Sequence, residues 1–339
     1  MHYLKTISTK RSRAVFGYHD GRVDDGESEE VVTACLMDCC KHVLALSGTP
    51  LPNRPGEAYV LARSLNWDSI DWQSEKAFMG RYNPVVRGQT ADGKVWVDEQ
   101  QGRLPELQNR LRAYFMTRHL KRDVLPQLKM PAYDLIQVEE TRAVKQALEA
   151  ERLLDIDPET LLGADGKIDG QVSTVRKQMG IAMAPQVGDY VAELLDNGEP
   201  KLVLFAWHIE VLNILEDRLR PYGIVRVDGS HSAKAKDRKV REFVDSPKMR
   251  VILGNTLSLG TGTDGLQLVS NHALIAEPDW VPGNNIQCFD RLDRGGQTRT
   301  VQGDIFVAPG SVAERILAAA LRKGQTLHKV LDRQVENAA

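Results

Sequence analysis

The sequence lacks the features that mark membrane-spanning and secreted proteins. Its 339 residues contain no apolar run of about 18 residues, the length that a membrane-spanning helix requires. The N-terminus, MHYLKTISTKRSR, has no apolar stretch of the signal-peptide kind. These absences predict a protein that is not secreted and has no membrane partner.

Cysteine is scarce. The chain has 4 cysteines, Cys35, Cys39, Cys40 and Cys288, and no second Cys or His pair stands at zinc-ligand spacing from the first three. The Cys-x-x-x-Cys-Cys cluster could bind a metal ion, but reduced thiols in a cytosolic protein are the simpler interpretation. We therefore predict no metal site.

Strong net charge is also missing. The formal net charge is −2, so no overall field attracts nucleic acid, and binding would need a local basic groove. In one predicted helix Lys234, Arg238 and Arg241 share a face, with Lys236 and Lys239 beside it. This face either contacts a nucleic-acid backbone or is simply solvated.

The chain has no phosphate-binding loop of the G-x-x-x-x-G-K-[ST] type. The pairs Gly93-Lys94 and Gly166-Lys167 are not followed by Ser or Thr. We therefore expect no segment of this chain to cradle the β- and γ-phosphates of a nucleotide.

A glycine-rich loop, GTGTDG at 260–265, does match G-x-G-x-x-G. A dinucleotide-binding fingerprint opens directly off a strand and starts a helix, whereas here TLSL precedes the loop and a strand follows it. The pattern favours a backbone that approaches phosphate or nucleic acid. A nicotinamide-dependent enzyme is the third alternative, and it would require nucleotide binding that Gly262→Val abolishes.

The hydrophobic pattern predicts an α/β fold. From residue 201 onward five apolar strands alternate with amphipathic helices; the strands are KLVLFAW, IVRVDG, RVILGN, HALIAEP and TVQGDIFVAP. This alternation predicts a parallel sheet that is covered on both faces, with its chemistry at the carboxyl ends of the strands.

The first half of the chain has a less regular pattern. We predict a helix within residues 29–46 that leads into a short strand, HVLAL, and further helices at about 54–65 and 104–122. A hairpin with Asp92-Gly93 as its turn lies between those two helices. Residues 139–196 are predicted to be mostly helical.

A pair of arginines is the strongest candidate for chemistry. If QCFDRLDRGGQ is helical, Gln287, Arg291 and Arg294 stand at i, i+4 and i+7 on one face. Two guanidiniums beside an amide suit a polyphosphate, because each offers planar, permanently charged donors. The alternative is a solvated face on which Asp290 and Asp293 pair with the arginines.

Several segments, in this order, resemble the motifs of Swi/Snf-type superfamily-two DNA translocases. The third motif is similar to LALSGTPLPNRPGEAYVLARSL, and the segment that braces the two lobes is similar to RHLKRDVLPQLKMP. The fourth motif is similar to KLVLFAWHIEVLNILEDRL. The D-G-S block is similar to RVDGSHSAKAKDRKVREF. The fifth motif is similar to VILGNTLSLGTGTDGLQL, and the sixth is similar to ALIAEPDWVPGNNIQCFDRLDRGGQ. The sub-branch most similar is that of annealing helicases and phage-encoded members.

This resemblance implies two RecA-like lobes with parallel sheets, of which the first is incomplete. The implied domains are a partial first lobe at 1–135, a helical connection at 136–197 and a complete second lobe at 198–339. ATP, with Mg²⁺, would lie between the lobes, and the chain would be bacterial or phage-encoded and located in the cytoplasm or nucleoid.

The resemblance also implies residue roles. Arg291 and Arg294 match the family's arginine fingers. The residues implied to line or sense the ATP site are His2, Ser47, Gly48, Thr49, Gly262, Asp264, Gly265, Gln287 and Gln297. Those implied to contact DNA are Asp228, Gly229, Ser230, Thr256, Lys234 and Arg238. The fifth motif departs from A-G-G-x-G-L-N-L, and Asp293 and Gly295 replace a His and an Ile of the sixth.

The N-terminus departs most from the family. Its second motif reads D-E-x-H, and aligning His2 with that histidine would put the Asp and Glu, which hold Mg²⁺, before residue 1. We expect the C-terminal portion of a translocase that moves on duplex or forked DNA, inactive as an ATPase alone. The alternative is a non-enzymatic module that binds DNA, the missing lobe or a full-length translocase. Either way, a sheet edge and apolar surface near HVLAL should be exposed.

Overall fold

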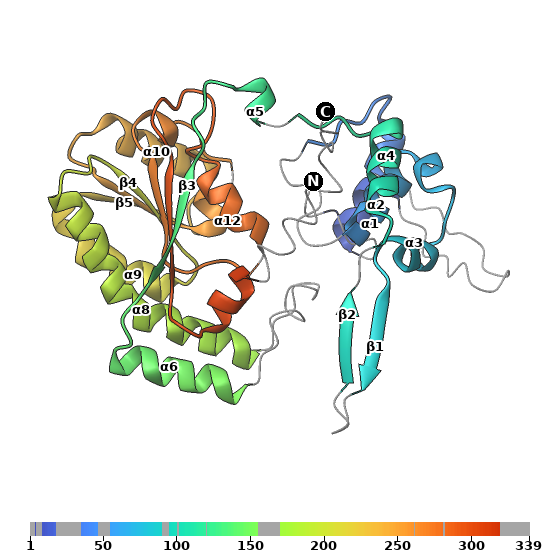
Figure 1. The fold of residues 1–339 in the computed structure, drawn as a ribbon. Helices are drawn as coiled ribbons and strands as arrows, with labels where there is room; N and C mark the ends of the chain where they lie inside the picture. The colour runs from blue at the N-terminus through green and yellow to red at the C-terminus, as the bar shows by residue number, and fades with distance from the viewer. Residues whose placement is uncertain are drawn as a thin grey trace, which may run out of the picture. The chain divides into compact units, whose positions relative to one another are not determined.

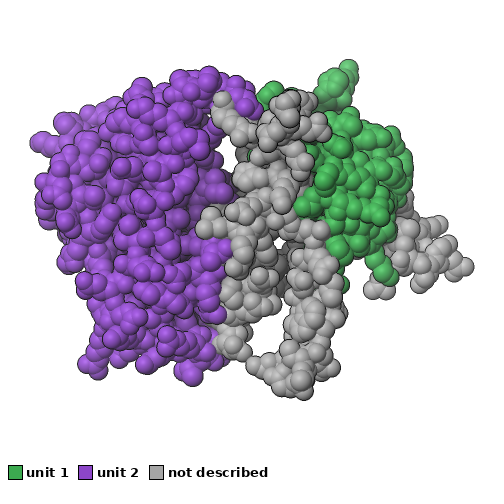
Figure 2. All heavy atoms as spheres, viewed as in Figure 1, with its two compact units in different colours: residues 1–119, 322–339 green, residues 120–321 purple. Residues whose placement is uncertain are grey.

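The computed structural model describes residues 4, 9–17, 35–46, 55–89, 95–99, 102–119, 121–154, 170–260, 262–280 and 282–318. The chain divides into two compact units, unit 1 (residues 1–119 and 322–339) and unit 2 (residues 120–321), which Figure 2 colours separately. In the described ranges, no helix is both long and apolar enough to cross a membrane.

Unit 2 is built on a six-stranded sheet in which every pair of neighbours is parallel (Figure 1). The order across the sheet is β3-β8-β7-β4-β6-β5. The strands are β3 (Ala132–Gln137), β4 (Leu202–Ala206), β5 (Ile224–Val227), β6 (Val251–Asn255), β7 (His272–Ile275) and β8 (Gln302–Val307). The predicted α/β class is therefore confirmed for unit 2.

Helices cover both faces of this sheet (Figure 1). One face packs against α6 (Arg142–Leu153), α8 (Gly170–Asp196) and α9 (Ile209–Leu219). The other packs against α10 (Ala233–Asp245) and α12 (Pro282–Phe289). Shorter helical segments are α5 (Lys121–Val124), η5 (Arg220–Tyr222), α11 (Thr256–Leu259), η6 (Leu266–Leu268) and a helix at 312–318.

The central strand β4 shows why this unit tolerates a continuous apolar run. Leu202, Leu204 and Ala206 belong to the core on one face, whereas Val203 and Phe205 belong to the core on the other. Successive strand side chains point to opposite faces, so a strand that is covered on both sides needs apolar residues at every position.

The boundary between the units differs from the predicted one at residue 135. β3 pairs along its whole length with β8, from Ala132 opposite Gln302 to Gln137 opposite Val307, and so belongs to unit 2. The sequence AYDLIQ does not have the uniform apolar pattern of β4 because β3 is an exposed edge strand. α6 and α8, expected in a separate helical connection, instead contribute to the unit 2 core.

Unit 1 is helical with one antiparallel ribbon. Its longer helices are α1 (Lys10–Phe16), α2 (Ala58–Leu65), α3 (Glu75–Tyr82) and α4 (Leu104–Tyr114), with 3-10 segments η2 (Leu36–Cys39), η3 (Pro55–Glu57) and η4 (Trp67–Ile70). The predicted hairpin is present as β1 (Val85–Gln89) and β2 (Val95–Glu99), whereas its turn lies outside the described residues. The described part of unit 1 contains no parallel sheet.

Three predictions for unit 1 are wrong. The helix predicted within residues 29–46 is present in the described residues 35–46 only as η2. HVLAL is not a strand, and Leu44 and Leu46 are 89% and 84% exposed. An apolar pattern alone does not make a strand, since a strand needs a neighbour to pair its backbone groups. The helix predicted to reach residue 122 ends at Tyr114. The expected exposure of apolar surface near HVLAL is confirmed, whereas HVLAL provides no sheet edge because it forms no strand.

Candidate anion-binding site at the arginine pair

The candidate site lies in unit 2 where the loop that follows α11 meets the loop that follows α12. The first loop follows β6 and α11, and Asn255 fixes its start. The Asn255 side chain accepts a hydrogen bond from the Leu257 amide at 3.1 Å and donates one to the Trp207 carbonyl at 2.6 Å. This side chain therefore caps α11 and ties it to the end of β4.

The second loop carries the arginines, and it is not helical as predicted. α12 ends at Phe289, and tight turns follow, with the Arg291 amide bonded to the Cys288 carbonyl at 3.2 Å and the Leu292 amide to the Phe289 carbonyl at 2.9 Å. Gly296 adopts a left-handed conformation with φ of 96°, which ends the segment. A shared helical face therefore does not bring the arginines together.

A carbonyl group of the first loop brings them together instead. Nη1 of Arg291 and Nη1 of Arg294 each donate a hydrogen bond to the Thr263 carbonyl at 3.2 Å. Nε of Arg291 also donates to the Gln287 carbonyl at 3.2 Å. Two guanidiniums thus converge on one acceptor while keeping further N–H groups for an incoming anion.

The loop at 262–265 owes its shape to two glycines. Gly262 and Gly265 have φ of 73° and 96°, a region that side chains with a Cβ rarely enter. Between them, the Asp264 carboxylate accepts hydrogen bonds from the Gly265 amide at 2.9 Å and Gln267 Nε2 at 3.0 Å, and these donors lower its pKa. Its Oδ1 lies 3.3 Å from Nη1 of Arg294.

Electrostatics at the pair favour a bound anion. Burial, and then the positive charge of Arg294, lowers the pKa of Arg291, so the two like charges destabilise each other. Asp290 and Asp293 do not pair with these arginines, because both carboxylates bind Lys121. The predicted alternative, in which Asp290 and Asp293 pair with the arginines, is therefore not what the structure shows; the carboxylate beside Arg294 is Asp264. An anion at this position would relieve the repulsion.

Two residues that we predicted to contact ATP or DNA instead form side-chain hydrogen bonds with the protein backbone. The Gln297 side chain donates to the Ser270 carbonyl at 2.9 Å and accepts from the Thr298 and Arg299 amides, and it is buried. Thr256 is 2% exposed and donates to the Ala206 carbonyl at 3.3 Å. These side chains hold loops in place, and their burial disagrees with direct contact to ATP or DNA.

Asp228 also has a structural role. Its Oδ1 accepts hydrogen bonds from the Ser230 amide at 3.1 Å and hydroxyl at 2.6 Å, and its Oδ2 accepts from Arg226 at 2.9 Å. Burial alone would raise the pKa of Asp228, but these donors outweigh it and lower the pKa to about 2. Only Gly229 and Ser230 of this turn are exposed to solvent. DNA contact there remains a prediction.

The predicted basic face is present on α10. Lys234, Arg238 and Arg241 are all exposed. Arg241 pairs with Asp237 at 2.9 Å, one helical turn away, which reduces its availability to a phosphate. Lys234 and Arg238 are therefore the better candidates for contact with a nucleic-acid backbone.

Four predicted ATP-site residues, His2, Ser47, Gly48 and Thr49, lie outside the described residues. Among the residues that are described, no group of three or more His, Cys, Asp or Glu is placed to hold a metal ion.

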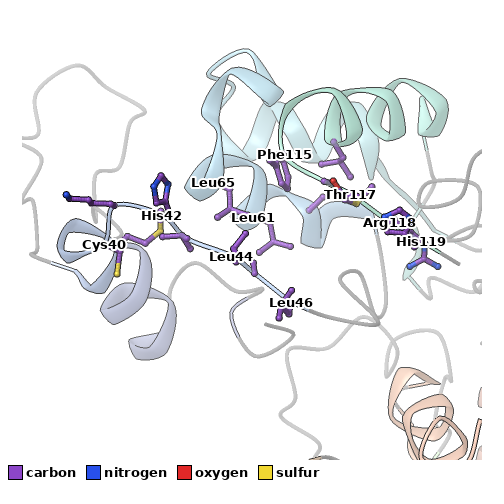
Figure 3. Close-up of a pocket in the computed structure, with 17 residues that line it drawn as sticks. Cys40, His42, Leu44, Leu46, Leu61, Leu65, Phe115, Thr117, Arg118 and His119 are labelled. Atoms are coloured by element: carbon purple, nitrogen blue, oxygen red, sulfur yellow. The ribbon is translucent and has the colours of Figure 1, made fainter. Parts of the chain in front are cut away.

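Unit 1 has an open cavity of about 740 Å³ that the sequence did not indicate (Figure 3). One wall is the extended segment with Leu44 and Leu46, and another is formed by Leu61 and Leu65 of α2 with Phe115 (Figure 3). These walls are apolar. The signal available in the sequence was the HVLAL run, which we interpreted as a short strand.

Sequence reasoning missed two participants in the arginine site, Lys121 and Thr263. Thr263 contributes a carbonyl group, which every residue has, so nothing in its side chain marks it. Lys121 lies 169 positions before Asp290, and only the fold brings them into contact.

Known proteins provide a separate line of evidence. No family model matches the chain. The DNA annealing helicase and endonuclease ZRANB3 of Bos taurus is 28% identical over 99% of this chain. A SWI/SNF-related matrix-associated actin-dependent regulator of chromatin subfamily A-like protein 1 of Xenopus tropicalis is 28% identical over 91%. Among solved structures, the C-terminal part of the Fun30 ATPase domain covers 57% of the chain at 16% identity, with 90% of its own length matched and a TM-score of 0.43.

The chain spans 29% and 30% of the lengths of these two curated relatives. Both relatives come from eukaryotes, so they lend no support to the predicted bacterial or phage origin. The match to them is nevertheless continuous over almost all of this chain. The chain is therefore a relative of Swi/Snf-type superfamily-two helicases over almost all of its length.

Proposed function

We propose that this chain is the C-terminal portion of an ATP-dependent DNA translocase or helicase, in which Arg291 and Arg294 act on the phosphates of ATP. The observation that carries the proposal is the convergence of both guanidiniums on the Thr263 carbonyl. A sequence relationship to a DNA annealing helicase supports the same class of substrate. Unit 2 would be the second RecA-like lobe of such an enzyme.

The geometry suits stabilisation of developing charge. Arg291 is held by its own helix end and by Thr263, so its position is fixed before an anion arrives. Donors held in place stabilise a transferring phosphoryl group without reorganising during the reaction. The left-handed glycines at 262 and 265 allow the loop to remain close to the pair.

We propose further that the chain alone binds polyphosphate weakly and does not hydrolyse ATP. Its 339 residues contain no G-x-x-x-x-G-K-[ST] segment to hold the β- and γ-phosphates. A first RecA-like lobe would supply that segment and the ligands for Mg²⁺. Mg²⁺ would neutralise charge on the phosphates when bound.

Turnover of ATP by the purified chain, with and without duplex DNA, tests this proposal. We expect no hydrolysis above background. DNA-stimulated turnover that Arg294→Ala abolishes would overturn the inactivity. Arg299→Ala is the matched control, because exposed Arg299 lies close in sequence but donates to the Val269 carbonyl, not to Thr263.

A second candidate function, a non-enzymatic DNA-binding module, is favoured by the exposed basic face of α10. Such a module would bind duplex DNA with a steep salt dependence. Replacing both Lys234 and Arg238 with Ala should lower the slope of log affinity against log salt by roughly 2, because each phosphate that is no longer neutralised lowers it by about 0.9. Arg241→Ala is the control, since Arg241 is already paired. Absence of DNA binding at low salt would contradict this candidate.

A further inference from the structure

We propose that Lys121 is a positioning residue for the arginine pair: it neutralises Asp290 and Asp293 and so prevents these two carboxylates from occupying the Arg291 and Arg294 donors that would bind a polyphosphate. This inference rests on the proposed function and concerns the same site.

The Lys121 ammonium group is fixed by several acceptors. It donates to Asp293 Oδ2 at 2.8 Å and to the Asp293 carbonyl at 2.7 Å, and it also bonds Asp290 Oδ1. An ordinary surface ion pair contributes little, because two mobile side chains must be ordered in water. Here one partner is largely buried, since the Asp293 side chain is 10% exposed. Lys121 is therefore more than a solvated surface charge.

A second contact holds the same chain segment against α12. The ring of Tyr133 on β3 stacks on that of Phe289, with centroids 4.8 Å apart. Gly303 leaves the room for this stack, since a Cβ there would approach both rings within 2.7 Å. This stack fixes β3, the strand that follows α5, against Phe289, the residue at which α12 ends and the arginine turns begin.

Without Lys121, the two carboxylates would need other cations. A buried carboxylate that loses its partner is costly, so Asp293 would recruit whatever positive group is near. Arg291 and Arg294 are its near neighbours in sequence, and guanidiniums bind carboxylates through two donors at once. That pairing would occupy the guanidinium donors that could otherwise bind an anion. The uncompensated negative charge of the carboxylates would also repel the anion.

The test measures the binding of tripolyphosphate to the 339-residue chain at low salt, with phosphorus NMR as the readout. Lys121→Met should weaken binding about tenfold, as truncation of one partner of a close charge pair does. Adding Asp290→Asn and Asp293→Asn to that variant should restore binding to within about twofold, since no carboxylate then competes. Lys121→Arg, which keeps the charge, should bind like the unchanged protein.

Two controls separate this inference from the proposed function. Lys177→Met removes a lysine paired with Glu210 between α8 and α9, on the other face of the sheet, and should leave binding unchanged. Arg294→Ala should abolish binding and reports on the arginine site itself.

Each outcome decides something. If Lys121→Met binds tripolyphosphate as tightly as the unchanged protein and Arg294→Ala does not bind it, the role of Lys121 is overturned and the proposed function stands. If Lys121→Met binds weakly and the added Asp290→Asn and Asp293→Asn substitutions do not restore binding, Lys121 has only a structural role. That result also overturns the inference. Indifference of binding to Arg294→Ala, or no binding by the unchanged protein, overturns both proposals.

Discussion

The two units place leucine in opposite environments. In unit 2, Leu204 lies on the central strand β4 and has 0% of its surface exposed. In unit 1, Leu44 sits in an apolar run of similar composition and is 89% exposed. The local sequences, LVLFA and HVLAL, are both apolar enough to predict a strand. The difference is that β4 has a parallel neighbour on each side, β6 and β7.

The comparison shows that an apolar run specifies a buried strand only when other strands satisfy its backbone. Unit 2 supplies neighbours within residues 202–307, and both faces of its sheet are then covered by helices. The core of unit 1 is instead formed by α2, α3, α4 and η4, with Tyr59, Phe78 and Tyr82 in ring contact. The segment at 40–46 does not join that core.

The largest expected difference is between two identical substitutions. Leu204→Ala should lower the free energy of unfolding of unit 2 by about 3 kcal/mol, because it removes a fully buried side chain and leaves a cavity. Leu44→Ala should change the stability of unit 1 by less than about 0.5 kcal/mol, because the side chain is already in water. Urea unfolding with hydrogen exchange resolved by unit measures both. Comparable losses of unfolding free energy in the two units would contradict this difference.

Acid should affect unit 2 through Asp228. Its folded pKa of about 2 lies below the ordinary value of 3.8, so its stabilisation is full above pH 3.8 and is lost as the pH falls towards 2. The shift corresponds to about 2 kcal/mol at neutral pH. Asp228→Asn should lose up to that amount at pH 7 and show a smaller decline between pH 5 and 2. Parallel pH profiles for both proteins would contradict this role.

Matched helix caps provide a smaller test. In unit 2 the Thr141 hydroxyl accepts from the Val144 amide at the start of α6, and in unit 1 the Ser74 hydroxyl accepts from Ala77 at the start of α3. Each substitution to Ala should cost about 1 kcal/mol. The loss should register only in the unit that holds the cap, if the two units unfold separately. Thermal melts that shift as one transition for both variants would show instead that the units are coupled.

The smallest effect on stability should come from making the exposed run polar. Leu44→Lys with Leu46→Lys should leave the unfolding free energy of unit 1 within about 0.5 kcal/mol while reducing binding of a hydrophobic dye. Both side chains line the unit 1 cavity, so fluorescence of the dye reports on that surface directly. Unchanged dye binding would show that the apolar surface of this segment is covered in solution.

The predictable part of unit 2 was its element order. Alternating strands and helices from residue 201 onward led to β4 through β8 with the intervening helices, because periods of 2 and 3.6 are local properties. The edge strand β3 (Ala132–Gln137) was not predicted, and the predicted domain boundary at 135 cut through it. Its sequence, AYDLIQ, mixes polar and apolar residues, and its partner β8 lies about 170 positions away.

At the candidate site, the sequence alone determined which residue types could bind an anion, since Arg291 and Arg294 are permanently charged wherever the chain puts them. It gave the wrong reason for their proximity, because α12 ends at Phe289, before either arginine, and so provides no shared helical face. Only the tertiary structure decided that they meet on the carbonyl of Thr263 and that Lys121 holds the intervening carboxylates. The physical reason is that charge and periodicity are encoded locally, whereas a carbonyl acceptor and a distant ammonium become partners only through the packing of loops.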